Sequence, residues 1–156
     1  MQKMGDPYIP SEPELVRAKL EFAELTETDL VFDLGCGDGR VLIIAAEEYG
    51  AHGVGVDIQE GVVEEAWARI VDHDLEDMVE VRCEDFQDTD ISQADVLILY
   101  LTTRTLHSLS DKLREAKAGA RIVTHDFALS GWDLSEQDHW VAEDGSSKAL
   151  YLYRQN

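Results

Sequence analysis

The stretch DLGCGDG, from Asp33 to Gly39, decides the fold. It follows a short apolar segment, Leu30 to Phe32, that is typical of a β-strand, and it precedes a helix-like segment from Val41 to Tyr49. A glycine-rich turn between a strand and a helix is where α/β proteins hold the polar part of a nucleotide cofactor. The sequence therefore predicts a cofactor loop at the carboxyl end of a first strand.

Charge separates the cofactor classes that use such loops. Dinucleotides place a pyrophosphate on backbone N–H groups at glycines spaced G-x-G-x-x-G. Here Gly35, Gly37 and Gly39 give G-x-G-x-G, and two carboxylates, Asp33 and Asp38, flank the turn. They would repel a pyrophosphate but attract the sulfonium and the α-ammonium of S-adenosylmethionine. The loop therefore favours a methyl donor over NAD.

An acid at the end of the next predicted strand also indicates a cofactor site. Asp57 ends the next apolar run, residues 53–56, eighteen positions beyond Gly39, where an acid in such folds accepts the ribose hydroxyls. Two alternatives stay open: a plain connecting turn with Asp38 as the helix N-cap, and a NAD-binding domain. Binding of NAD but not of S-adenosylmethionine would favour the latter.

Length and composition limit the class of protein. The 156 residues are enough for one domain with one core, which we expect to span residues 1–156. No apolar stretch has the length of a membrane span and no leader pattern is visible, so we expect a soluble, cytoplasmic protein without a membrane partner. Cys36 and Cys83 are too few for a disulfide framework.

The chain is strongly acidic. Thirty-three Asp and Glu against thirteen Lys and Arg give a formal net charge of −20. Self-repulsion of this size would be screened by salt, which leads us to expect a halophilic protein from a salt-rich cytoplasm. Nucleic-acid binding is disfavoured because no Lys/Arg cluster is visible to neutralise phosphates. Basic protein segments are the more natural large partner.

The rest of the chain alternates between strand and helix patterns. Ser11 and Glu14 have the spacing of a capping box that would start a helix at Pro13. Helices are expected at residues 13–25, 39–49, 60–72 and 103–115, and strands at residues 30–34, 53–57, 79–83, 95–101 and 120–125.

The end of the chain differs from this alternation. Residues 139–142 and 149–153 are apolar or aromatic and flank a Gly/Ser-rich turn, which predicts an antiparallel hairpin. We therefore expect an α/β fold with a doubly wound, mostly parallel seven-stranded sheet, closed by a C-terminal antiparallel hairpin.

These motifs resemble one superfamily over nearly the whole chain, the class I, seven-strand S-adenosylmethionine-dependent methyltransferases, which have a Rossmann-like fold. Within it, the chain is similar to the small protein-lysine methyltransferases that include archaeal broad-specificity enzymes and the mitochondrial enzyme that methylates the membrane ring of ATP synthase. The segments that carry the resemblance are residues 8–11 (YIPS), 32–40 (FDLGCGDGR), 124–127 (THDF) and 131–132 (GW).

The resemblance implies where the cofactor binds. Asp33, Gly35 and Gly37 would hold its methionine portion. Asp57 would hold the ribose, with Ile58 beside it. S-adenosyl-L-methionine is thus the expected cofactor.

The adenine and the closing segment are also implied by the resemblance. Glu84, Asp85 and Phe86 follow the third strand at the position that contacts adenine, and Tyr8, in an N-terminal segment spanning residues 1–12, would close over the cofactor. Phe86 could instead be a core residue, and Glu84 a solvated loop acid.

The acceptor side is expected at the ends of the fourth and fifth strands. A lysine acceptor must lose its proton before it can attack a sulfonium, and an aromatic wall can hold the cation until it does. The family pattern points to Tyr100, near the transferred methyl, and Asp126, which could orient the amine, as catalytic residues, with Tyr8, Phe127 and Trp132 as further aromatic walls. Several of these could instead be core residues.

His125 is a candidate general base, although a histidine ending an apolar strand is more often structural. No histidines have metal-ligand spacing, so no metal site is expected. The alternative functions are an RNA or small-molecule methyltransferase and a non-catalytic S-adenosylmethionine-binding module. The motif of adenine-amino methyltransferases is missing after the fourth strand, where residues 100–103 are YLTT.

Overall fold

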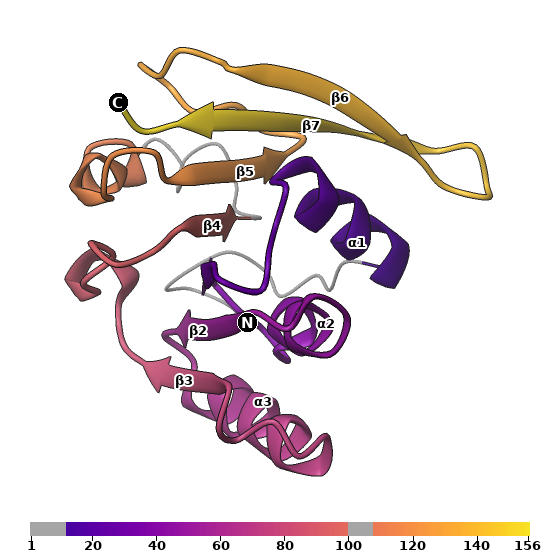
Figure 1. The fold of residues 1–156 in the computed structure, drawn as a ribbon, viewed down its shortest axis with the longest axis vertical. Helices are drawn as coiled ribbons and strands as arrows, with labels where there is room; N and C mark the ends of the chain where they lie inside the picture. Colours follow the sequence, from indigo (N-terminus) through magenta and orange to yellow (C-terminus); the bar gives the residue numbers. More distant parts are fainter. Residues whose placement is uncertain (1–11, 100–107) are drawn as a thin grey trace.

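The computed structural model describes residues 12–99 and 108–156, which form one seven-stranded sheet in the order β3-β2-β1-β4-β5-β7-β6 (Figure 1). The first five strands run parallel, β7 is antiparallel to β5, and β6 is antiparallel to β7. The strands are β1 (Leu30–Leu34), β2 (His52–Asp57), β3 (Val79–Cys83), β4 (Val96–Leu99), β5 (Arg121–His125), β6 (Glu136–Val141) and β7 (Ser147–Arg154). The predicted α/β sheet and its terminal hairpin are confirmed.

Three α-helices whose full length lies in the described residues follow the predicted pattern. They are α1 (Pro13–Phe22), α2 (Arg40–Tyr49) and α3 (Glu60–Asp72). α1 ends three residues before the predicted Leu25, because Glu24 takes a left-handed φ of 56° and the Leu25 N–H turns back to the carbonyl of Leu20. The residue before the helix is Glu12, whose side chain makes no cap, and Ser11, the expected N-cap, lies outside the described residues.

The helix expected at residues 103–115 is described only from residue 108, and residues 108–109 are helical. Residues 103–107 lie outside the described part of the chain, and the described remainder ends in a short 3₁₀ helix, η2 (Lys112–Glu115). Another 3₁₀ helix, η1 (Phe86–Asp88), follows β3. The hairpin also begins earlier than predicted, because β6 is an exposed edge strand whose polar residues give no apolar signal.

Two apolar clusters pack on the two faces of the sheet. On one face, Val31, Ile98 and Val123 pack with the apolar sides of α1 and α2 and with Ile70 of α3. On the other face, alternate residues of the same strands pack with segments of residues 86–94, 109–116 and 129–132. The described α-helices thus cover one face, while short turns and 3₁₀ helices pack on the other.

Two glycines bring α2 very close to β2. A Cβ atom added at Gly53 or at Gly55 would lie 2.7 Å from a methyl carbon of Leu42. At Gly55 it would also lie 2.9 Å from the Cβ and Sγ of Cys36, which is buried. A side chain at either position would force Leu42 to move, and at Gly55 it would also displace the buried Cys36, so glycine suits β2 here. The close approach fixes the Asp33–Gly39 loop against the end of β2.

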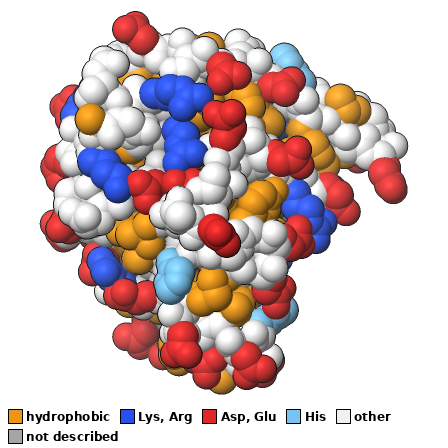
Figure 2. Space-filling view, viewed as in Figure 1, with side chains coloured by type: hydrophobic (Ala, Val, Ile, Leu, Met, Phe, Trp, Pro, Cys, Tyr) orange, Lys and Arg blue, Asp and Glu red, His pale blue; other side chains and the backbone are white. Residues whose placement is uncertain are grey.

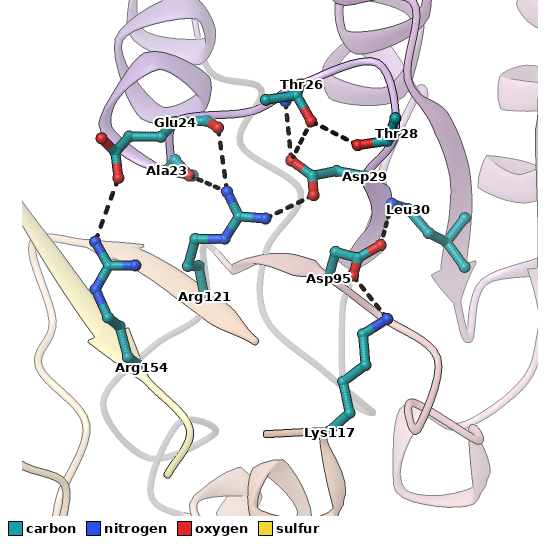
Figure 3. Close-up of polar contacts among 10 residues, drawn as sticks. All are labelled: Ala23, Glu24, Thr26, Thr28, Asp29, Leu30, Asp95, Lys117, Arg121 and Arg154. Atoms are coloured by element: carbon teal, nitrogen blue, oxygen red, sulfur yellow. Dashed lines mark hydrogen bonds and ion pairs between the residues drawn. The ribbon is translucent and has the colours of Figure 1, made fainter. Parts of the chain in front are cut away.

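A polar network joins the loop after α1 to the amino ends of the strands (Figure 3). Arg121 donates to the carbonyl oxygens of Ala23 and Glu24, at 2.8 and 3.1 Å, and pairs with Asp29 at 2.6 Å. Asp95 accepts from the N–H of Leu30 at 2.8 Å and pairs with Lys117 at 2.7 Å. This amino-end network holds β1, β4 and β5 together at the end of the sheet remote from the glycine loop.

Within the described ranges, the helices are too short or too polar to cross a membrane.

Candidate functional site

The glycine loop has a backbone that requires its glycines. Gly35, Gly37 and Gly39 have φ angles of 86°, 54° and 81°, in the left-handed region that other residues rarely adopt. The N–H groups of Gly35 and Cys36 both donate to the carbonyl oxygen of Val56, at 2.7 and 3.0 Å. The loop is therefore held at the end of β2.

Asp57 lies directly against this loop. Its side chain is buried, one carboxylate oxygen accepts from the N–H of Gly37 at 3.2 Å, and the other accepts from the N–H of Gln59 at 3.0 Å. Each oxygen keeps a second lone pair for a hydroxyl donor. The structure thus places Asp57 beside Gly35 and Gly37, with acceptors suited to a ribose diol.

Asp38 does not have the role suggested by its charge. The residue is buried, and its carboxylate pairs with Arg40 at 2.6 Å and with Arg69 at 3.2 Å. Two guanidinium groups offset its charge, so the expectation that Asp38 attracts a cationic ligand was wrong. The arginines come from α2 and α3, and their direction toward the loop could not be read from spacing alone.

Asp33 is the next-to-last residue of β1 and faces the side of the sheet covered by α1, because side chains alternate along a strand and Val31 lies in that core cluster. Its pKa is raised to about 7 by burial, while the charge of Lys19 opposes the rise and Asp57 and Asp38 add to it. The carboxyl group is 5% exposed. A cationic ligand near it would favour the ionised form.

Lys19 is the buried cation opposite this carboxyl group, and the sequence analysis missed it. It is 1% exposed on α1. Burial lowers its pKa to about 8, against the charges of Asp33 and Asp126. The sequence does contain a sign that Lys19 is buried. It lies with Leu15, Val16 and Leu20 on the apolar side of the helix, where a surface lysine would not be expected.

His125 ends β5 and is 1% exposed. Burial, together with the charges of Lys19 and Lys148, lowers its pKa to about 2. The imidazole therefore stays neutral at physiological pH and is a very weak base. This electrostatic setting favours the structural alternative for His125 over general-base catalysis.

Asp126 has a strained backbone and an engaged carboxylate. Its φ is 68°, unusual for a residue with a side chain. The Asp126 N–H donates to the carbonyl oxygen of Ala149 at 2.9 Å, and its carboxylate accepts from the N–H of Ala149 at 3.3 Å. The ammonium of Lys148 lies 3.2 Å from the other carboxylate oxygen. β7 therefore fixes a half-buried carboxylate that already binds an ammonium group.

The residues expected near adenine lie after β3. Asp85 accepts from the N–H of Gln87 at 2.9 Å and so caps η1, while Glu84 accepts from the Thr89 hydroxyl at 2.7 Å. The N–H of Glu84 also donates to the carbonyl oxygen of Asp57 at 3.1 Å, which joins the ends of β2 and β3.

Apolar side chains accompany these acids. Ile58, directly after Asp57, is 41% exposed, and Phe86 is partly buried against the core. An exposed isoleucine after β2 and an aromatic ring after β3 are each suited to contact a flat base.

The aromatic candidates separate into three groups. Tyr8 and Tyr100 lie outside the described residues. Phe127 is partly exposed beside Asp126. Trp132 is a packing residue, since it is 9% exposed, donates to the carbonyl oxygen of Ser110 at 3.0 Å and has the guanidinium of Arg114 3.8 Å from its ring centroid. The expectation that Trp132 forms an acceptor wall was wrong.

The residues at the glycine loop fit S-adenosylmethionine. Asp33 and Asp57 supply two buried carboxylates at one loop, the glycines bring bare backbone close to a ligand, and Ile58 offers an apolar contact. In the described part of the chain, no group of three His, Cys, Asp or Glu side chains is arranged to hold a metal. A cationic, phosphate-free nucleoside cofactor matches this chemistry better than a pyrophosphate does.

The fold and site together define an S-adenosylmethionine-dependent methyltransferase of the Rossmann-like class. In particular, the chain belongs to the ANTKMT methyltransferase domain family, whose sequence model matches residues 33–136. The family match includes the glycine loop, Asp57, Asp85 and Asp126.

Relatives agree with this assignment. The chain is 37% identical to a protein-lysine N-methyltransferase of Saccharolobus islandicus, over 94% of this chain and 92% of that protein. It is 27% identical to a lysine N-methyltransferase of Xenopus laevis that acts on the C-type subunit of ATP synthase, over 85% of this chain and 58% of that protein.

A solved structure of an RNA methyltransferase from Salinibacter ruber in complex with S-adenosyl-L-homocysteine superposes with a TM-score of 0.86. The two chains are 34% identical, and the superposition covers 94% of this chain and 93% of the Salinibacter ruber chain. A geranyl diphosphate methyltransferase in complex with SAM superposes with a TM-score of 0.75 at 14% identity and shows the fold alone. S-adenosylmethionine is thus the cofactor of this chain.

Proposed function

We propose that this protein transfers methyl groups from S-adenosylmethionine to lysine side chains of proteins. The observation that carries the proposal is 37% identity along 94% of the chain to a protein-lysine N-methyltransferase. Two further relatives, from Xenopus laevis and Caenorhabditis elegans, are lysine N-methyltransferases that act on ATP synthase.

The cofactor supplies an electrophilic methyl group when it is bound. The protein has to place the lone pair of an acceptor nitrogen opposite the leaving sulfur, which is mainly a problem of orientation. We propose that Asp33, Gly35, Gly37 and Asp57 fix the cofactor at the loop, and that Ile58, Glu84, Asp85 and Phe86 lie along its base. Tyr8 and Tyr100 keep their proposed roles near the cofactor and the methyl group.

We propose that Asp126 orients the acceptor amine. Its carboxylate is held by the N–H of Ala149 and pairs with the ammonium of Lys148 at 3.2 Å. A group that binds one ammonium can bind a lysine substrate in the same way. His125 acts through its neutral, buried ring as part of the end of β5 rather than as a base.

The charge of the chain supports a protein acceptor. Acidic side chains are spread over the face shown in Figure 2, and the formal net charge is −20. Such a surface attracts basic protein segments and repels the phosphates of nucleic acids. A lysine-bearing protein is therefore the favoured partner.

RNA is the second candidate acceptor, because the similar solved structure from Salinibacter ruber is that of an RNA methyltransferase. The charge argument opposes this candidate but does not concern the catalytic chemistry, which the fold can apply to either acceptor. The acceptor has to be decided by experiment.

The test is transfer of a labelled methyl group from S-adenosylmethionine to a cell extract, with the Asp33→Asn variant as the control. We expect incorporated label to be released by protease and retained after ribonuclease. Label released by ribonuclease and retained after protease would overturn the proposal in favour of RNA. No incorporation above the control would leave a small-molecule methyltransferase or a binding module.

We also propose that the protein works in a salt-rich cytoplasm. Cys36 and Cys83 are both free thiols, which suits a reducing compartment. The net charge of −20 suits high ionic strength.

A further inference from the structure

A cavity of about 470 Å³ lies along the first and middle residues of β1 and β2 and along β3 as far as Arg82. Its floor includes Phe32, Val54 and Glu80, which are register neighbours across the three strands. Phe32 and Val54 belong to the apolar cluster on the face opposite α1 and α2. The cavity therefore opens on the face of β1 to β3 that the described α-helices leave uncovered; we call it the β1–β3 groove.

The β1–β3 groove is separate from the cofactor site. Leu30 and His52, at one end of it, are the first paired residues of β1 and β2, whereas the glycine loop follows the last residue of β1. Phe32 and Val54 line the groove, whereas Asp33 and Asp57 lie one and three positions further along the same strands, so their side chains project from the opposite face of the sheet. A ligand in the groove would therefore leave Asp33 and Asp57 accessible to the cofactor.

Acidic side chains line the rim of the groove. Glu76 and Asp77 come from the loop between α3 and β3, and Asp90 comes from the loop before β4. All three are exposed, and in the parts of the chain that the structure describes none forms an ion pair. The cation of the groove, Arg82, is paired with Glu80 at 2.6 Å. The rim therefore carries a net negative charge.

The floor of the groove adds an apolar component. Leu30 and Met78 line it and are half-buried rather than fully buried. Lysine and arginine side chains have an apolar stem and a charged head, and they pack the stem on apolar surface while the head stays at a polar rim. An apolar floor with three carboxylates above it matches this shape, and it disfavours acidic peptides and phosphates.

We propose that the β1–β3 groove docks a basic, lysine- or arginine-rich segment of the protein substrate, separately from the lysine that is methylated. This inference rests on the proposed function. Because the groove and the glycine loop are separate sites, the docked segment and the acceptor lysine have to be joined by a stretch of substrate chain that reaches from one to the other. The groove would thus select substrates in which a basic cluster and the target lysine are separated by such a stretch.

The test uses a short fluorescein-labelled oligolysine peptide as the probe and measures its dissociation constant by fluorescence anisotropy at about 0.15 M KCl, where longer-range charge effects are reduced. The variant Glu76→Gln/Asp77→Asn/Asp90→Asn neutralises the rim. The matched control, Glu64→Gln/Glu65→Gln/Glu143→Gln, removes the same charge from residues that line no part of the groove. We expect the rim variant to weaken binding roughly tenfold and the control less than about twofold.

If both variants weakened peptide binding equally, the docking proposal would be overturned, since the peptide would then respond to net charge alone. Amide NMR shifts of the unaltered protein give a second measurement that does not depend on the variants. The peptide should shift Met78, Val79 and Gln93, and shifts confined to other regions would contradict the proposal. Binding is measured without turnover, so a failure of the groove is distinguishable from a failure of methyl transfer in the extract assay.

Discussion

The two ends of the parallel strands both hold buried charge, but they compensate it differently. At the amino ends, Arg121 has Asp29 and two carbonyl oxygens within 3.1 Å, so its charge is fully matched (Figure 3). At the carboxyl ends, Asp33 and Asp57 lie at one loop, and burial raises the pKa of Asp33 to about 7 even with Lys19 nearby. The matched end stabilises the fold, whereas the unmatched end is suited to a cationic ligand.

The largest expected effect comes from removing the buried ion pair at the amino ends of the strands. Arg121→Met leaves Asp29 buried without its partner and should lower the free energy of unfolding by about 3 kcal/mol, because an uncompensated buried charge is costly. Urea denaturation measures this loss. Lys117→Met is the control, since Lys117 is 43% exposed and its pair with Asp95 should contribute less than about 1 kcal/mol. Equal losses in the two variants would contradict the comparison.

The second effect concerns the unmatched end. Asp57→Asn keeps the shape of the side chain but removes the charge, so it should weaken S-adenosylmethionine binding by roughly 30-fold, or about 2 kcal/mol, the value of a charged hydrogen bond. Isothermal titration calorimetry measures the affinity.

Asp38→Asn is the companion variant to Asp57→Asn, because Asp38 lies in the same loop but is paired with Arg40 and Arg69. It should reduce stability more than cofactor affinity. If Asp38→Asn weakened binding as strongly as Asp57→Asn, the neutralisation of Asp38 by the arginines would be the wrong explanation.

The third effect is a dependence on pH. The pKa of Asp33 is about 7 in the folded protein against 3.8 in the unfolded chain, so between these pH values only the folded protein keeps Asp33 protonated. The contribution of Asp33 to the free energy of unfolding therefore falls as pH rises from about 4 to 7. A cationic cofactor prefers the ionised form. Its affinity should therefore rise with pH up to about 7, by at most about tenfold per pH unit.

Calorimetry in buffers of different ionisation enthalpy should detect proton release on cofactor binding below pH 7 and little release above it. Lys19→Met removes the charge that lowers the pKa of Asp33, so it should move the rise in affinity to higher pH. An unchanged profile in Lys19→Met would show that Asp33 is not the titrating group.

The smallest expected effect is an increase of thermal stability with salt concentration. With a net charge of −20, the midpoint temperature of unfolding should rise by several degrees between about 0.1 and 1 M KCl, because salt screens the repulsion among surface carboxylates. Differential scanning fluorimetry measures the shift. The same midpoint at both concentrations would contradict the proposal of adaptation to salt.

The sequence predicted those parts of the fold that depend on local pattern. The G-x-G-x-G pattern predicted a turn between β1 and α2, and the apolar and alternating runs predicted the five parallel strands β1 to β5. Asp57 was predicted to lie near the loop because it follows the neighbouring strand. These predictions succeed because backbone sterics and alternation of burial act over a few residues.

Features that depend on contacts between distant residues were missed. Arg69 comes from α3 to pair with Asp38, and no spacing in the sequence indicates this pair. Lys19 comes from α1 toward Asp33, and its place on the apolar stripe of α1 does not indicate which carboxylate it meets. Trp132 was misassigned because an aromatic residue in a family motif looks the same whether it lines a site or packs against Arg114. Such pairings become visible only when the helices are placed on the sheet.

The most direct test of the central claim is mass spectrometry of a cell extract incubated with the protein and with S-adenosylmethionine carrying a trideuterated methyl group. The account predicts trideuteromethyl groups on lysine residues of proteins, absent when Asp57→Asn replaces the unaltered enzyme. Deuterated methyl groups found on nucleosides of RNA and on no lysine would contradict it.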